Sequence, residues 1–217
     1  MRETITLDFS SPEILYLCKK DKRLEKIIKI IGPITYEKKY SEDAYAFLVH
    51  EIIEQMLSAK VGNIIYSRLQ DLCGGTICPE IMSKLSFEEI KSTGTSQRKA
   101  QNIMDLTQTI LSKELVLEQL YDLPDDQVMK RLMELNGIGK WTAKMYLIFV
   151  LDRKNVLPYE DAAFLQSYHW LYKSKERNVE AIKENCKKWE PYSSIASRYL
   201  YIALDTGLTK KEFHLYK

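Results

Sequence analysis

The sequence predicts an all-α fold. Apolar residues recur at intervals of three and four along most of the 217 residues, as they do on the buried face of a helix. Only residues 4–9 alternate as a strand does, and one short strand cannot form a sheet. Just 8 glycines and 6 prolines interrupt the chain, so we expect short loops and no long linker.

Helix-start signals give the order of the elements. The proline of Ser11-Pro12-Glu13 suits the first position of a helix, and Ser41-Glu42-Asp43 opens a strongly apolar one. Later starts are marked by capping-box patterns or by a proline, at Ser86-x-x-Glu89, Pro124 and Thr209-x-x-Glu212. A helix over 199–204 is expected to end at Thr206-Gly207.

Composition limits the class of protein. Apolar residues make up 45% and charged residues 29% of the chain, as in ordinary globular proteins, and a net charge of +2 does not by itself indicate nucleic-acid binding. No run approaches the ~20 apolar residues of a membrane span, and no signal-peptide core opens the chain. Four scattered cysteines favour reduced thiols. We therefore expect a cytoplasmic protein with no membrane partner.

A turn bracketed by glycines joins two expected helices at residues 135–143, Leu-Asn-Gly-Ile-Gly-Lys-Trp-Thr-Ala. Gly137 and Gly139 let the backbone approach a ligand closely, and Ile138 would turn inward and pin the loop. A helix that starts near Lys140 would direct its first amides at a phosphate, which the lysine would also contact. The alternative is an ordinary helix–turn–helix corner. The hairpin therefore indicates DNA binding without indicating a reaction.

A lone acid follows the second hairpin helix. Asp161 stands 20 residues after Trp141 and shortly after Pro158. A backbone clamp for DNA near one carboxylate suggests an enzyme that breaks a bond in DNA. The other role for Asp161 is the N-cap of a helix over 162–172, and the two roles are compatible because a cap position aims the carboxylate.

Five segments of the chain, in order, resemble the helix-hairpin-helix DNA glycosylases, and within them the 3-methyladenine DNA glycosylase II (AlkA-type) branch. They are residues 54–60, 93–100, 135–143, 158–161 and 189–196, and the likeness spans roughly residues 15–205. The resemblance implies a two-lobed helical bundle with a helix-hairpin-helix motif and with the active site in the cleft between the lobes.

The order of the helices and the resemblance together predict how the lobes are built. Residues 1–217 would form one glycosylase unit, with a central lobe over about 40–150 that ends in the hairpin helices, 125–151. The N- and C-terminal helices, about 10–39 plus 152–217, would pair into the second lobe. The few residues before the first helix resemble the compact form of the branch.

The resemblance also implies excision of damaged bases from double-stranded DNA by a monomer, with alkylated purines of the 3-methyladenine type favoured. Asp161 is then the catalytic residue, since its carboxylate would stabilise positive charge on the sugar and orient or deprotonate water. Trp141 and Tyr201 would line the base pocket, because an aromatic face attracts a cationic base. For both rings the alternative is core packing.

Four further residues are expected to contact DNA. A side chain must fill the space that a flipped-out base leaves, and the resemblance favours Gln97 for this role, with a solvated loop residue as the alternative. Arg98 and Lys99 would contact phosphate or form a charged helix start. Thr142 would contact DNA together with the hairpin.

Two properties of the family bear on chemistry and on ions. Glycosylases with lyase activity form a Schiff base through a lysine at the position of Trp141, so we predict a monofunctional enzyme that needs no cofactor. An iron–sulfur cluster is not expected, because the cysteines are not grouped. Main-chain carbonyls of Met133, Leu135 and Ile138 would hold a sodium or potassium ion.

Two departures from the family pattern leave the substrate open. Tyr201 stands where close relatives often have Trp, and the family's Trp-x-Pro-Trp-Arg reads Trp189-Glu-Pro-Tyr192-Ser193. The competing functions are a glycosylase of the same fold for deaminated or oxidised bases, and a non-catalytic helix-hairpin-helix protein that binds damaged DNA.

Overall fold

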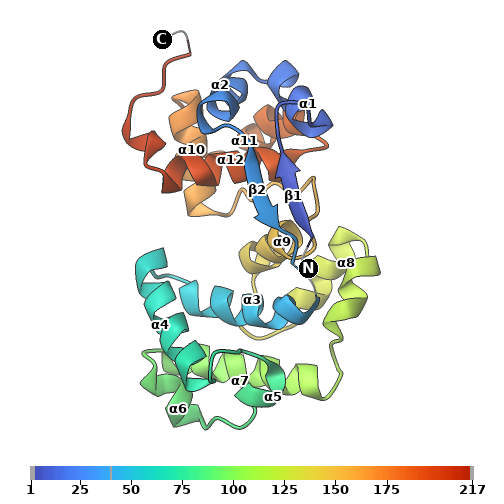
Figure 1. Cartoon of the computed structure of the whole chain (residues 1–217), viewed down its shortest axis with the longest axis vertical. Helices are drawn as coiled ribbons and strands as arrows, with labels where there is room; N and C mark the ends of the chain where they lie inside the picture. Colours follow the sequence, from blue (N-terminus) through green and yellow to red (C-terminus); the bar gives the residue numbers. More distant parts are fainter. Residues whose placement is uncertain (1–2, 40, 216–217) are drawn as a thin grey trace. The chain divides into compact units, whose positions relative to one another are not determined.

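A computed structural model describes residues 3–39 and 41–215, which fold into two compact units (Figure 1). Unit 1 comprises Met1–Lys38 and Asp152–Lys217, and unit 2 comprises Lys39–Leu151. The fold is all-α, as predicted, with one small two-stranded ribbon. Within the described residues, no helix combines the length and the apolar character needed to cross a bilayer.

Unit 2 is helical and packs around α3. Ser58, Ser86 and Ser96 each accept a hydrogen bond from a backbone amide and so begin a helix, and the predicted capping box at Ser86 is confirmed. Helix α3 contacts α4, α7 and α9. The elements are α3 (Ser41–Glu54), α4 (Ala59–Leu72), α5 (Pro79–Met82), α6 (Phe87–Ser92), α7 (Gln97–Leu111), η1 (Leu117–Asp122), α8 (Asp125–Met133) and α9 (Lys140–Phe149).

Unit 1 joins the two ends of the chain, so that helices from both ends share one core. Helix α12 packs against α2 and α10. The N-terminal elements are β1 (Thr4–Leu7), α1 (Pro12–Lys20), α2 (Lys22–Ile31) and β2 (Ile34–Glu37). The C-terminal elements are α10 (Ala162–Tyr172), α11 (Val179–Cys186), η2 (Lys187–Trp189), α12 (Ser193–Asp205) and η3 (Leu208–Lys210).

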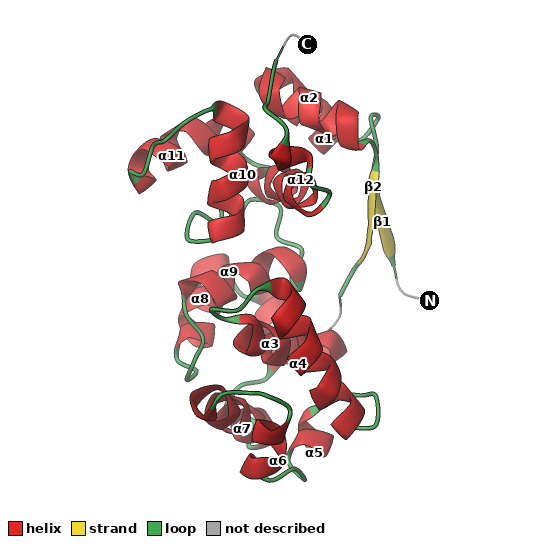
Figure 2. Ribbon diagram, turned by 90° about the vertical axis from the view of Figure 1, so that its left-hand side faces the viewer, coloured by secondary structure: helices red, strands yellow, loops and turns green. Residues whose placement is uncertain are grey.

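The expectation that no sheet would form is wrong. Strand β1 pairs antiparallel with β2, so that Thr4 lies opposite Glu37 and Leu7 opposite Ile34 (Figure 2). Strand β2 has only four residues, too few to show a clear alternation, and its partner lies on the far side of two helices in the sequence. Leu7 and Ile34 are both buried, which anchors the ribbon to the core of unit 1.

The capping box expected at Thr209 is also wrong. Gly207 adopts a left-handed conformation, and the three residues after it form only the short η3 turn. The Glu212 carboxylate, which a capping box would use, instead pairs with Lys173 at 2.6 Å. Lys173 directly follows α10, and no α-helix begins after η3 within the described residues.

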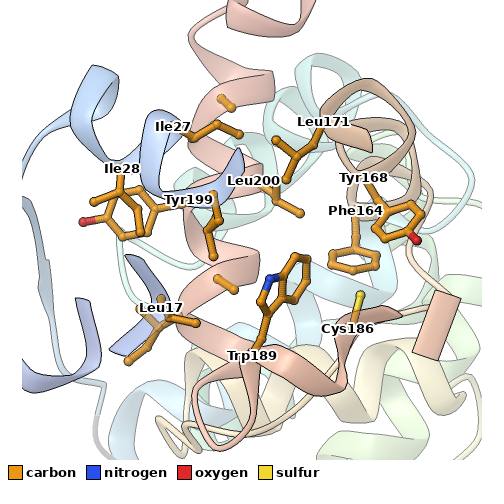
Figure 3. Packing of buried hydrophobic residues seen from close by; sticks show 14 of the residues in the cluster. Leu17, Ile27, Ile28, Phe164, Tyr168, Leu171, Cys186, Trp189, Tyr199 and Leu200 are labelled. Carbon is orange, nitrogen blue, oxygen red and sulfur yellow. The ribbon is translucent and has the colours of Figure 1, made fainter. Parts of the chain in front are cut away.

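Trp189 lies at the centre of the unit 1 core (Figure 3). Its indole is fully buried among residues from several segments, including Leu17, Phe164 and Tyr199. Cys186, one turn earlier, is buried with it, and burial raises the pKa of this thiol to about 12. The thiol therefore stays protonated and serves as a small apolar side chain, as the sequence suggests.

A buried carboxylate fixes α2 against this core. One oxygen of Asp21 accepts hydrogen bonds from the Arg23 and Leu24 amides at 3.0 and 3.2 Å, which makes Asp21 the N-cap of α2. The other oxygen accepts the Trp189 indole N–H at 2.9 Å and the Tyr172 hydroxyl, and Lys188 lies 3.3 Å away. Burial opposes ionisation, but these donors outweigh it and lower the pKa of Asp21.

Candidate functional site

The two glycines of the hairpin have different structural roles. Gly137 has φ of 83°, and an added Cβ would lie 2.2 Å from Nδ2 of Asn102. Gly139 is extended, with φ of −101°, and an added Cβ would have no neighbour within 4 Å. Only Gly137 therefore needs the conformational freedom of glycine. Gly139 instead leaves an open surface in front of the first turn of α9.

Contacts on its inner side hold the hairpin in place. Gln55 donates a hydrogen bond to the Gly137 carbonyl at 2.7 Å, and Ile138 is only 5% exposed, as its expected role of pinning the loop requires. Thr142 is 1% exposed, and its hydroxyl accepts a second bond from Gln55 at 3.4 Å. The expected contact between the Thr142 side chain and DNA is corrected accordingly, because this side chain supports the hairpin from within.

The outer side of the hairpin suits an anion. Helix α9 begins at Lys140, as expected, and no side chain caps its first amides because the N-cap residue is Gly139. Lys140 itself is exposed. Amides at the start of a helix carry partial positive charge, so a phosphate would meet both these amides and the lysine.

A groove of about 620 Å³ runs past the hairpin within unit 2. Three segments that are remote in sequence line it: the turn between α3 and α4, the start of α7, and the hairpin. The lining residues are Gln55, Met56, Leu57, Ser96, Arg98, Lys99, Asn102, Gly137, Ile138 and Gly139. The structure thus brings Arg98 and Lys99 together with the glycines, whereas Gln97 is exposed on the first turn of α7 and does not line the groove.

Met56 is the residue that the sequence analysis missed. It is 101% exposed and has φ of 60°, a left-handed conformation that costs a non-glycine residue about 1–2 kcal/mol. An apolar side chain held out of the surface in a strained conformation indicates a function. The available sequence signal was the pair Met56-Leu57, two apolar residues between the end of one helix and the N-cap Ser58 of the next.

Lys99 does not project into the solvent as a phosphate contact would. Its ammonium donates hydrogen bonds to the carbonyls of Ile53 at 2.8 Å and Gln55 at 2.6 Å. Burial lowers the pKa of this half-buried amine. Arg98, by contrast, is exposed at the groove and can reach an external anion.

Asp161 is the N-cap of α10, the helix over 162–172 that the sequence predicts. The side chain is 8% exposed, and its Oδ1 accepts the Phe164 amide at 2.6 Å. The preceding loop is fixed by Ser194 of α12, whose hydroxyl accepts the Val156 amide at 2.8 Å. The carboxylate is thus held at the positive end of a helix by residues from two segments of unit 1.

The two expected pocket aromatics belong to different units. Trp141 is half-buried on the first turn of α9 in unit 2, whereas Tyr201 on α12 packs against the core of unit 1. Core packing, the alternative for Tyr201, is therefore at least part of its role. Ser193, at the family's arginine position, is buried and donates a hydrogen bond to Asn155 at 2.8 Å.

One cluster in unit 2 has the composition of a metal site. His50, Glu51 and Glu54 place ligand atoms within 4.8 Å of one another. Glu51 lies 3.4 Å from Nδ1 of His50, whereas Asn63 lies 3.1 Å and Glu54 3.8 Å from Nε2. A metal takes the lone pair of one ring nitrogen, but these acceptors flank both, as suits an imidazolium. The hydrogen bond to Glu51 is the main cause that raises the pKa of His50. His50, Glu51 and Glu54 all lie on α3, so the link from this cluster to α4 is the hydrogen bond between His50 and the uncharged amide of Asn63.

Comparison with known proteins identifies the family. The HhH-GPD superfamily of base excision DNA repair proteins matches residues 49–191. DNA-3-methyladenine glycosylase 1 of Schizosaccharomyces pombe is 26% identical over 208 residues, which cover 92% of this chain and 90% of that protein. The crystal structure of a DNA-3-methyladenine glycosidase from Bacillus halodurans has a TM-score of 0.79 at 30% identity, over 96% of each chain.

A second solved structure has the same fold. The S. pombe 3-methyladenine DNA glycosylase in complex with abasic DNA has a TM-score of 0.83 at 23% identity, over 95% of this chain and 100% of that one. Together with the groove, the hairpin and the capped carboxylate, the family match over most of the chain settles the assignment. The chain belongs to the HhH-GPD superfamily of base excision DNA repair proteins.

Proposed function

We propose that the chain is a monofunctional DNA glycosylase that hydrolyses the N-glycosidic bond of alkylated purines flipped out of double-stranded DNA. The observation that carries the proposal is the buried Asp161 carboxylate in a chain of this repair family. Its orientation is fixed by the hydrogen bond from the Phe164 amide, at the start of α10. The names of the S. pombe and B. halodurans relatives support 3-methyladenine as the type of lesion.

In the proposed reaction the bond between C1′ and the base breaks, and the electron pair leaves with the base. A 3-alkylated adenine is already cationic, so it departs as a neutral molecule without an added proton. Positive charge then develops on the sugar, where the Asp161 carboxylate stabilises it. Water attacks C1′, and the same carboxylate orients the water and accepts its proton.

The groove of unit 2 would hold the DNA. Phosphate would lie against the amides at the start of α9, with Lys140 and Arg98 adding charge. Trp141 would stack on the cationic base, with Tyr201 as the second proposed pocket ring.

Main-chain carbonyls of Met133, Leu135 and Ile138 are the proposed ligands of an alkali ion. The first two lie at the end of α8, where cations are stabilised, and the Leu135 carbonyl, which accepts the Ile138 amide at 3.1 Å, keeps a second lone pair.

We propose Met56, rather than Gln97, as the side chain that fills the space left by the flipped base. Met56 is apolar, fully exposed and at the groove, and apolar side chains readily enter a base stack. Gln97 is exposed but lies outside the groove lining.

The enzyme would act as a monomer in the compartment that holds its DNA, the cytoplasm of a prokaryote or the nucleus of a eukaryote.

Met56→Ala is expected to slow single-turnover base release from a methylated duplex by roughly ten-fold or more, because the cost of unstacking is no longer offset. Gln97→Ala is the matched control and should excise at the wild-type rate. On a single-stranded substrate, where no stack is broken, the Met56 effect should shrink. A larger loss from Gln97→Ala than from Met56→Ala would return the role to Gln97.

The two hairpin glycines offer a paired test of the phosphate site. Gly137→Ala should destabilise unit 2 by about 2 kcal/mol or more, because it combines a left-handed backbone with overlap on Asn102. Gly139→Ala should fold normally yet bind duplex DNA about ten-fold more weakly, since its methyl group occupies the open surface before the α9 amides. If a folded Gly139→Ala variant binds duplex DNA with unchanged affinity, no phosphate is bound in front of the α9 amides.

The reaction class is tested by chromatography of the bases released from methylated and from deaminated or oxidised DNA. The proposal predicts free 3-methyladenine and intact abasic strands. Incubation with borohydride should give no covalent protein–DNA adduct, because Trp141 occupies the position of the lyase lysine. A trapped adduct would contradict the monofunctional mechanism, and binding without release of any base would leave only the non-catalytic alternative.

A further inference from the structure

Lys99 reaches back to the end of α3. Its ammonium donates to the carbonyl oxygens of Ile53 and Gln55, at 2.8 and 2.6 Å. These carbonyls lie at the C-terminal end of α3, where backbone acceptors lack partners within the helix and a positive charge is favourable. The half-buried ammonium is thus held by main-chain oxygens of another helix, and burial lowers its pKa.

The segment held in this way leads directly into Met56. A left-handed conformation of a methionine persists only where its neighbours fix it. Gln55 is tied twice, since its carbonyl accepts Lys99 and its side-chain amide donates to Gly137 at 2.7 Å. On the other side, Ser58 caps α4, which approaches the end of α3 closely because residue 62 is glycine: a Cβ there would lie 2.7 Å from Glu54.

We propose that Lys99 is a positioning residue for Met56. By holding the Gln55 carbonyl, it keeps Met56 in the left-handed conformation, so that the side chain stands out at the groove before DNA arrives. The charge of Lys99 is used inside the protein and does not neutralise a phosphate. The inference rests on the proposed function for the action of Met56 on DNA, whereas the effect on the Met56 conformation is independent of catalysis.

Arg98 provides the matched control, because it is the neighbouring cation, lines the same groove and is exposed. The binding constant for duplex DNA falls as salt is added, and each side chain that neutralises one phosphate makes the plot of log K against log salt concentration steeper by about 0.9. Arg98→Leu should therefore make the slope for duplex binding shallower by about 0.9. Lys99→Leu should leave the slope at its wild-type value.

A double-mutant cycle on single-turnover base release tests the coupling. If Lys99 acts through Met56, Lys99→Leu slows release by roughly ten-fold, and the Lys99→Leu/Met56→Ala double variant is no slower than Met56→Ala alone. Arg98→Leu combined with Met56→Ala should show additive losses. Additive losses for Lys99 together with a shallower salt slope would overturn the proposal in favour of a phosphate contact.

A readout without activity separates this inference from the function. The methyl resonance of Met56, assigned by its loss in Met56→Ala, should shift or split in Lys99→Leu and stay in place in Arg98→Leu. An unchanged resonance in Lys99→Leu would overturn the positioning role even if the enzyme excises bases, whereas a shifted resonance in a chain that releases no base would contradict only the proposed function.

Should Lys99→Leu not fold, Lys99→Gln replaces it in the salt and resonance experiments, since its uncharged amide can still donate to the carbonyls. The positioning role then predicts a wild-type salt slope and a Met56 resonance near its wild-type position, and a phosphate contact predicts a shallower slope.

Discussion

Replacing Asp161 by Asn is expected to lower the single-turnover rate of base release from methylated DNA by about 10²–10⁴-fold. The amide is uncharged, so it neither stabilises a cationic sugar nor accepts a proton from water. Asparagine is as good an N-cap as aspartate, so the bond to the Phe164 amide and the start of α10 should survive. The loss should therefore appear in the rate, with abasic-DNA affinity and the unfolding midpoint close to wild type.

Glu160→Gln is the control for this experiment. Glu160 is the adjacent carboxylate and is half-buried, but it does not cap α10. The Glu160→Gln variant should retain most of the rate if the cap position selects the catalytic carboxylate. A fully active Asp161→Asn enzyme, or a larger loss in Glu160→Gln, would show that the carboxylate has been wrongly assigned.

Replacing Asp21 is expected to have the largest effect on stability. Asp21→Ala leaves the Trp189 indole, the Tyr172 hydroxyl and the Lys188 ammonium without their shared acceptor. Removing one partner of a buried charge network costs about 3–5 kcal/mol. For a chain of this size that corresponds to a fall of about 10 °C in the unfolding midpoint. Thermal unfolding followed by circular dichroism measures it.

Two controls define the origin of that loss. Glu25→Gln removes two exposed ion pairs, with Lys22 and Lys29 at 2.8 Å each, and should cost about 1 kcal/mol or less. Asp21→Asn keeps an acceptor for the α2 amides but cannot serve the donors on the other side equally well, so it should resemble Asp21→Ala. A loss as small as that of Glu25→Gln would mean that the network contributes little.

The same carboxylate predicts a pH dependence of stability. Because the pKa of Asp21 is lowered in the folded state, its contribution is complete above the unfolded-state pKa of about 3.9 and is lost as the pH falls through the folded-state value. The free-energy difference between wild type and Asp21→Asn should thus be constant near neutral pH and narrow in acid. A difference that grows on acidification would contradict this linkage.

The sequence predicts the fold well wherever the signal is local. Glycine at 137, the helix beginning at Lys140 and the cap at Asp161 each follow from a few neighbouring residues, and the structure places them as expected. Strand β2 was missed because its formation depends on a partner that lies two helices earlier. At Thr209 the capping box does not form: only the short η3 turn follows Gly207, and Glu212 pairs with a distant lysine instead.

The site is harder to predict because the direction of a side chain is a tertiary property. Adjacent cations at 98 and 99 read as one charge run, yet Arg98 is exposed while Lys99 turns back to α3. Thr142 belongs to the hairpin sequence but lies on its inner side. Met56 lies within the segment 54–60 that resembles the family, but its own importance becomes visible only through its backbone conformation and its exposure.

The division of the chain into units has a consequence for its synthesis. Unit 2 is one continuous segment, whereas the core of unit 1 needs α1 and α2 together with α10 and α12. A ribosome therefore delivers all of unit 2 before unit 1 can close. Leu17, Ile27 and Ile28 must wait with their apolar faces uncovered until Trp189 and Tyr199 emerge. During synthesis, the apolar surface of α1 and α2 is therefore the part of the chain most prone to aggregation, and this risk ends when α10 and α12 cover that surface.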